Sequence, residues 1–198
     1  MAVQPRIIGL AGTNGSGKDT VGHILAIDYG YLFISVTDLL REEALKQKLE
    51  PSRENLRMIS AEWRRQTGQL GILVDKALDK FQQTAEDYEG LTIASIRHPG
   101  EADRVHELGG KVIWIDADPR VRYNRIQANA TTRGRAAEDA KTFEQFQAEE
   151  AAEMNQSGDN ATLNMLAVKD RCDIIIQNNS DDLKAFHLLI KQKLDLVN

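Results

Sequence analysis

The feature that most constrains this chain is a glycine-rich segment, GTNGSGKDT, that directly follows a short apolar run. The apolar run, residues 6–12, predicts a strand buried on both faces, as in a parallel sheet. Residues 18–30 then have the apolar spacing of an amphipathic helix, with Gly30 as its stop. Between them the sequence reads G-x-x-x-x-G-K, and a strand before and a helix after form the context in which this motif binds phosphate.

The loop therefore predicts a binding site for the phosphates of ATP. Glycines let backbone N–H groups turn inward, and the helix that follows adds the positive end of its dipole. Lys18 adds a mobile cation for the β- and γ-phosphates. The predicted ATP-binding residues of the loop are Gly12, Thr13, Asn14, Gly15, Ser16, Gly17, Lys18, Asp19 and Thr20.

Asp19 departs from the usual motif, in which a Ser or Thr hydroxyl follows the lysine and ligates Mg²⁺. Here the hydroxyl comes one residue later, at Thr20. Asp19 either stabilises the start of the helix, by about 0.3–1 kcal/mol, or contacts the metal ion directly or through water. We expect Mg²⁺ at this loop, with Asp19 and Thr20 as its candidate protein contacts.

The composition narrows the classes of partner. The chain has 198 residues and a net charge of -5, and nothing in this balance indicates a nucleic acid or an anionic membrane. Cys172 is the single cysteine, which fits a reducing compartment. There is no apolar stretch of the roughly 18 residues that a bilayer requires, nor a leader-like start. We expect a cytoplasmic protein, and the sequence leaves its oligomeric state open.

The remaining strand and helix patterns alternate along the chain. This alternation predicts a three-layer α/β/α fold with a five-stranded parallel sheet as its middle layer. We expect one domain, which comprises residues 1–198. Residues 129–165 are polar and favour either a solvated helical hairpin or a mobile lid. The further predicted strands are 31–35, 91–95, 111–118 and 172–177, and the further helices are 36–48, 52–88 (interrupted at 68–71), 100–110, 119–129 and 180–194.

Arg97 follows a predicted buried strand, at the edge where open α/β sheets bind ligands. Its planar guanidinium suits a phosphate group bidentately. No carboxylate ends this strand, since Ala94 and Ser95 stand there. Because Mg²⁺ usually has one or two carboxylates nearby and this strand offers none, the loop's own Asp19 could supply one.

The chain resembles P-loop small-molecule kinases, in particular nucleoside and deoxynucleoside monophosphate kinases of the adenylate-kinase type. The resemblance rests on G-K-D-T at the loop, D-L-L-R at 38–41, R-x-x-x-E-A at 97–102, R-I at 125–126 and R-G-R at 133–135. It implies transfer of the ATP γ-phosphoryl group, with Mg²⁺, to a (deoxy)nucleoside monophosphate. Residues 36–90 would form an acceptor-binding helical region and residues 126–165 a lid-like insertion.

The same resemblance implies roles for individual residues. The acceptor-binding candidates are Asp38, Arg41, Arg64 and Arg97, with Arg57 and Arg65 as further possible contacts. The catalytic candidates are Lys18, Arg97, Arg125, Arg133 and Arg135, and Asn179 would lie near the adenine.

Three other functions stay open at this point. Dephospho-CoA kinases are also similar to the chain, and there Asp38 could serve as the base for a hydroxyl acceptor. A nucleotide-dependent regulatory NTPase would need ordered switch loops, and no such sequence is evident. The third alternative is a module that binds a nucleotide and has no catalytic activity. The arginine clusters favour a second anionic ligand, and therefore a kinase.

Overall fold

The computed structural model describes residues 6–130, 140–155 and 158–194, and its described part contains a five-stranded, all-parallel sheet. The strands lie in the order β2-β3-β1-β4-β5, and each neighbouring pair is parallel. This confirms the predicted fold class. The strands are β1 (Arg6–Ala11), β2 (Tyr31–Ser35), β3 (Gly90–Ile96), β4 (Lys111–Asp116) and β5 (Ile174–Gln177).

Helices connect the strands, and those predicted from the sequence are present within a few residues of their expected bounds. Residues 143–154 and 165–169 form two further helices that the pattern did not predict individually. The predicted interruption at residues 68–71 is present, because Gly68 ends a helix with a left-handed backbone, φ 69°. The helices are α1 (Lys18–Tyr29), α2 (Val36–Lys46), α3 (Arg53–Thr67), α4 (Ile72–Gln82), the 3-10 turn η1 (Ala85–Asp87), α5 (Pro99–Glu107), α6 (Pro119–Ala128), α8 (Phe143–Met154), α9 (Met165–Lys169) and α10 (Leu183–Leu194). None of these described helices is long and apolar enough to cross a bilayer.

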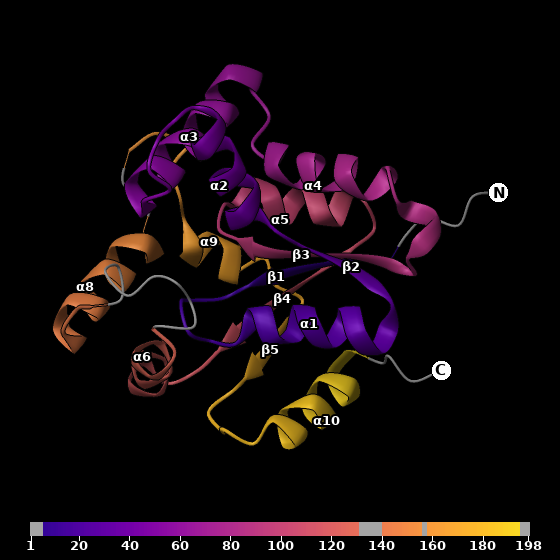
Figure 1. Cartoon of the computed structure of the whole chain (residues 1–198), viewed down its shortest axis with the longest axis vertical. Coiled ribbons are helices and arrows are strands. Elements are labelled where there is room, and N and C mark those ends of the chain that lie inside the picture. The colour runs from indigo at the N-terminus through magenta and orange to yellow at the C-terminus, as the bar shows by residue number, and fades with distance from the viewer. Residues whose placement is uncertain (1–5, 131–139, 156–157, 195–198) are drawn as a thin grey trace.

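Helices cover both faces of the sheet (Figure 1), and a hydrophobic core lies on each face. Alternate residues of the central strands supply them: Ala11 and Trp114 join the core beneath α2, α3, α4, α5 and α9, whereas Leu10 and Ile113 join the core beneath α1 and α10. Burial on both faces explains why these strands are continuous apolar runs rather than alternating ones.

The strand order decides where a ligand can bind. β1 lies in the centre, between β3 and β4, so the glycine-rich loop leaves the middle of the carboxyl edge of the sheet. The ends of β2 and β3 lie side by side there, with Ser35 opposite Ala94. Open parallel sheets bind ligands at this edge. Helices α6 and α8 lie beside it (Figure 1).

Candidate active site

The glycine-rich loop (residues 12–17) has the backbone that its sequence predicts. Gly12, Gly15 and Gly17 have φ values of 136°, 81° and 95°, which L-residues with a side chain rarely adopt. A Cβ on Gly12 would lie 2.3 Å from the carbonyl oxygen of Ile115. Only glycine fits there, because the loop must pass close to the end of β4.

The polar groups of the loop fit a bound phosphate. Thr13 Oγ1 and Ser16 Oγ are buried and have no hydrogen-bond partner within the described part of the protein. A buried hydroxyl without a partner costs free energy, and a phosphate oxygen would satisfy it. Lys18 is 6% exposed, at the first position of α1, where the helix dipole also favours an anion.

A cavity of about 760 Å³, here called the loop cavity, opens on one side of this loop. Its walls come from the loop, α1, α6 and the turn after β5. The residues that line it are Asn14, Gly15, Gly17, Lys18, Asp19, Thr20, His23, Arg125, Ile126, Asn129, Asn178, Ser180, Asp181, Leu183 and Phe186. Its position suits the nucleotide, with the phosphates at the loop and the base near the last turn.

Arg125 lines the loop cavity together with Lys18. Its guanidinium donates to the carbonyl oxygens of Asn178 and Ser180, both at 2.8 Å, and pairs with Asp181. The side chain therefore joins α6 to the turn after β5. Its catalytic assignment stays a prediction.

Asn178, rather than the predicted Asn179, faces the loop cavity. Asn178 Nδ2 donates to the carbonyl oxygen of Ser16 at 2.8 Å and so fixes the loop to the end of β5. The side-chain oxygen of Asn179 instead accepts from the backbone N–H of Asp118 at 2.7 Å. Asn178 is thus the residue of the pair that lines the loop cavity, and a role of this turn near the adenine stays a prediction.

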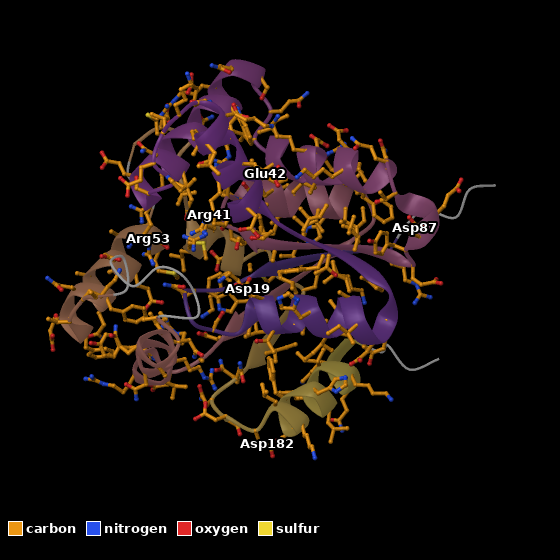
Figure 2. The ribbon with its side chains drawn as sticks, in the orientation of Figure 1. Asp19, Arg41, Glu42, Arg53, Asp87 and Asp182 are labelled. Carbon is orange, nitrogen blue, oxygen red and sulfur yellow. The ribbon has the colours of Figure 1, made fainter. Side chains whose placement is uncertain are left out.

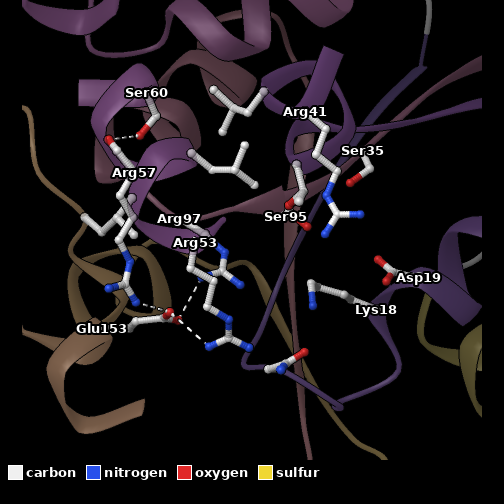
Figure 3. A pocket seen from close by; sticks show the side chains of 15 residues that line it. Lys18, Asp19, Ser35, Arg41, Arg53, Arg57, Ser60, Ser95, Arg97 and Glu153 are labelled. Carbon is white, nitrogen blue, oxygen red and sulfur yellow. Dashed lines mark hydrogen bonds and ion pairs between the residues drawn. The ribbon is translucent and has the colours of Figure 1, made fainter. Parts of the chain in front are cut away.

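A second cavity, here called the arginine cavity, lies on the other side of Lys18 and Asp19 (Figure 3). It holds about 100 Å³ of free volume between the ends of β2 and β3, α2, α3 and α8. Figure 2 shows Asp19, Arg41 and Arg53 gathered at this edge of the molecule. The residues that line it are Asn14, Lys18, Asp19, Ser35, Thr37, Leu40, Arg41, Arg53, Leu56, Arg57, Ser60, Ser95, Arg97, Glu153 and Leu163.

Arg41 lines the arginine cavity, as the D-L-L-R segment led us to expect. Its Nε is buried and has no hydrogen-bond partner among the described residues. Asp38, three residues earlier on α2, is exposed, and Thr37 takes its place in the cavity wall. The acceptor-binding assignment of Asp38 is therefore not supported, because the helix turns its carboxylate toward solvent.

Arg97, also predicted, lines the arginine cavity together with Arg53 and Arg57 of α3. These three, the arginine cluster, surround the carboxylate of Glu153 on α8. Glu153 lies 2.7 Å from Arg97, 2.5 Å from Arg57 and 3.8 Å from Arg53. Burial raises the pKa of Glu153, but the three guanidinium groups outweigh it and lower the pKa from 4.5 to about 2. The carboxylate is therefore ionised at neutral pH.

Arg64 does not reach the cavity, so its acceptor-binding assignment is wrong. The side chain is buried and pairs with Glu101 at 2.5 Å, and it donates to the carbonyl oxygen of Ala161 at 2.9 Å. Glu101 also accepts from the backbone N–H groups of Arg97 and His98, at 2.8 and 3.2 Å. Arg64 thus acts through Glu101, which holds the backbone that carries Arg97.

Ser95 has an unusual backbone conformation at the end of β3. Its φ is 69°, in the left-handed region that favours glycine, and the register of β1 against β3 shifts between Leu10 and Ala11 beside it. Non-glycine residues in this region cluster at functional sites. Ser95 lines the arginine cavity beside Arg97.

Arg53 and Glu153 are the cavity residues that sequence reasoning missed. Arg53 could have been found, since it lies four residues before Arg57 and hence on the same helix face. Glu153 could not, because 96 residues separate it from Arg57. Two predicted catalytic residues, Arg133 and Arg135, fall within 131–139 and lie outside the described residues.

The residues at the loop also fit Mg²⁺. Asp19 and Thr20 offer two oxygen donors beside the predicted phosphate position, and Mg²⁺ typically takes one or two protein carboxylates, with phosphate oxygens and water as its other ligands. Within the described ranges, no group of three or more His, Cys, Asp or Glu side chains could hold a metal ion without the nucleotide.

The parallel sheet, the loop after its central strand and the two cavities define a protein with a P-loop kinase-like fold. The chain belongs to the family described as "AAA domain", whose model matches residues 8–152. It is similar to a UPF0200 protein of Hyperthermus butylicus, with 30% identity over 149 residues, or 75% of each chain. That similarity makes it a member of the UPF0200 family as well.

Solved structures agree with this fold. A shikimate kinase from Bacteroides thetaiotaomicron has a TM-score of 0.61 and 12% identity, over 96% of this chain and 97% of the other. A shikimate kinase from Acinetobacter baumannii, solved with shikimate, has a TM-score of 0.51 and 16% identity, over 96% of each chain. At such identities the likeness concerns the fold alone.

Proposed function

We propose that the protein transfers the γ-phosphoryl group of ATP to a phosphorylated small molecule, a (deoxy)nucleoside monophosphate. One observation carries this proposal: Lys18 and Asp19 line both cavities. A nucleotide in the loop cavity and an acceptor in the arginine cavity would meet at these two residues. Phosphoryl transfer depends chiefly on such positioning and on neutralising charge.

The charges of the arginine cavity suit an acceptor that is itself an anion. Arg41, Arg53, Arg57 and Arg97 line it together with Lys18. A phosphate monoester has a second pKa near 6, so at neutral pH its oxygen is already a nucleophile and needs no general base. Arginine forks bind such oxygens bidentately, which would align the acceptor with the γ-phosphate of ATP. Bound Mg²⁺ would neutralise the phosphate oxygens of ATP.

The described residues offer less support for a hydroxyl acceptor, as in dephospho-CoA kinase. Such an acceptor benefits from a general base, and Asp38, the candidate base, is exposed on α2 and lies outside the arginine cavity. A regulatory NTPase without an acceptor leaves the arginine cavity unexplained. A cytoplasmic location remains the expectation from composition.

A panel of acceptors tests the proposal. We expect ADP release from ATP and Mg²⁺ only when a nucleoside or deoxynucleoside monophosphate is present. Dephospho-CoA and shikimate serve as hydroxyl acceptors for comparison. Release at the same rate without any acceptor would refute the proposal, and transfer to dephospho-CoA alone would replace it with the alternative.

The metal contact has its own test. Asp19→Asn keeps the size of the side chain and removes the charge. If Asp19 contacts Mg²⁺, the variant needs a higher Mg²⁺ concentration for half-maximal turnover, while the binding of metal-free ADP changes little. An unchanged Mg²⁺ dependence would leave Asp19 with its helix-stabilising role alone.

A further inference from the structure

Glu153 lies where the proposed acceptor would place its anionic group. Its side chain is only 10% exposed, and its carboxylate contacts Arg97, Arg57 and Arg53 (Figure 3). The three guanidinium groups are only partly exposed, at 25–44%, and positive charges gathered this closely favour an anionic partner between them. In the protein without ligand, Glu153 supplies the negative charge that a bound anion would supply in a complex.

The free volume of the arginine cavity leads to the same conclusion. It is about 100 Å³, whereas small-molecule sites typically hold about 300–1,000 Å³. An acceptor of nucleotide size therefore needs a side chain of the cavity wall to move. Two carboxylates line the cavity, Asp19 and Glu153, and Glu153 is the one that pairs with the arginine cluster. Its charge therefore competes with that of the acceptor.

Glu153 can leave without unfolding its helix. It lies in the last turn of α8, one residue before the helix ends at Met154. The helix is held one to two turns earlier, where Phe146 is 4% exposed and Glu150 pairs with Arg122 of α6, Nη2 to Oε2 at 2.9 Å. These anchors do not involve the arginine cluster, so they persist when Glu153 swings away.

We propose, on the basis of the proposed function, that Glu153 occupies the phosphate position of the acceptor and that only a dianionic phosphate group displaces it efficiently. A phosphate monoester carries about −1.5 to −2 charges and three acceptor oxygens. Replacing Glu153 with this group increases the negative charge among three guanidinium groups. Replacing Glu153 with the carboxylate of a ligand leaves the negative charge among the guanidinium groups unchanged, so it gives no electrostatic gain. Glu153 thereby selects phosphorylated acceptors over carboxylic acids.

The experiment measures binding rather than turnover. Methyl phosphate and acetate are titrated calorimetrically into the protein with saturating ADP and Mg²⁺, so that the glycine-rich loop is already filled. Wild type is expected to bind methyl phosphate and not acetate. Glu153→Gln is expected to bind methyl phosphate about 10–100-fold more tightly, the range for a charge-assisted contact, and to bind acetate measurably.

Glu144→Gln is the matched control. Glu144 lies on the same helix and loses the same charge, but it does not line the arginine cavity. It should behave as wild type toward both anions. If Glu153→Gln binds methyl phosphate no more tightly than Glu144→Gln, or more weakly, then Glu153 orients the arginines and the inference is overturned.

A second variant covers the case in which Glu153→Gln does not fold. Glu153→Asp keeps the charge but withdraws it by one methylene from the arginine cluster, so intermediate affinities for both anions are expected. Wild-type affinities in a folded Glu153→Asp protein would also contradict the inference. Because no turnover is measured, these results stand apart from the acceptor panel: either test can fail while the other succeeds.

Discussion

The two anion sites that we propose at the carboxyl edge of this sheet are built from different chemical groups. The loop site consists of backbone N–H groups, small hydroxyls and one lysine, and two of its buried hydroxyls have no partner among the described residues. The arginine site consists of long side chains from α2, α3 and the end of β3, and three of them already share Glu153. A site made of backbone is formed by the fold itself, whereas a site made of side-chain charges needs a counter-ion until its ligand arrives.

The largest expected effect comes from the lysine of the loop site. Lys18→Met removes the cation that lines both cavities, and we expect turnover to fall by about 10²–10³-fold, as for loss of one transition-state contact. Steady-state kinetics measure this loss. Lys184→Met, on the exposed face of α10, should leave turnover unchanged, and equal losses in both variants would contradict the role of Lys18.

Acid should weaken the arginine site through Glu153. The pKa of this group is lowered to about 2, so its contribution to folding is complete above its unfolded pKa near 4.5 and is lost as the pH falls toward 2. The contribution is on the order of 3 kcal/mol. Urea unfolding of wild type and Glu153→Gln should therefore give free energies that converge over this window. Parallel curves would show that the ion pairs contribute little.

Arg41→Gln tests the arginine that lies outside the cluster. Because its buried Nε lacks a partner among the described residues, we expect it to contact the acceptor without displacing anything. The KM for the acceptor should rise about 10–100-fold, while the KM for ATP stays within about twofold by the same reasoning. Arg171→Gln, an exposed arginine paired with Asp103, is the control. A rise in the KM for ATP instead would assign Arg41 to the nucleotide.

The smallest expected effect concerns the backbone between the two sites. Ser95→Gly relieves a left-handed residue, which costs about 1–2 kcal/mol, against an entropic cost of about 0.5–1 kcal/mol for glycine. We expect a gain in unfolding free energy of about 1 kcal/mol or less and a several-fold higher KM for the acceptor. Lys48→Gly, at the other left-handed non-glycine position among the described residues, should be stabilised with no change in KM.

The comparison also explains what the sequence could and could not predict. The loop site was predictable because its glycines, its lysine and their flanking strand and helix are neighbours in the chain. Arg57 and Arg64 show the limit: they lie seven residues apart, on one face of α3, yet Arg57 lines the cavity and Arg64 is buried against Glu101. Which residues of a helix line a cavity depends on the elements that pack against that helix, and the sequence of the helix does not show these elements.

The role of Glu153 could not be predicted from the sequence, because nothing in the local pattern of α8 distinguishes the glutamate that contacts α3 from the others. The strands and helices themselves were predictable to within a few residues, since buried apolar runs and glycine or proline boundaries are local signals. The acceptor side depends on contacts between elements, and these follow only from the packed structure.

The buried Arg64–Glu101 pair has a consequence for how the molecule can move. It joins the last turn of α3 to the start of α5, and Glu101 also accepts from the backbone N–H of Arg97. Breaking such a pair would cost about 3–5 kcal/mol, so we expect α3 and the end of β3 to move as one unit, with Arg57 and Arg97 at a constant separation. Helix α8 contacts this unit through carboxylates that an anion of higher charge can replace. We therefore expect acceptor binding to shift α8 and to leave α3 in place. The spacing of the arginines would then limit the size of the group that they bind.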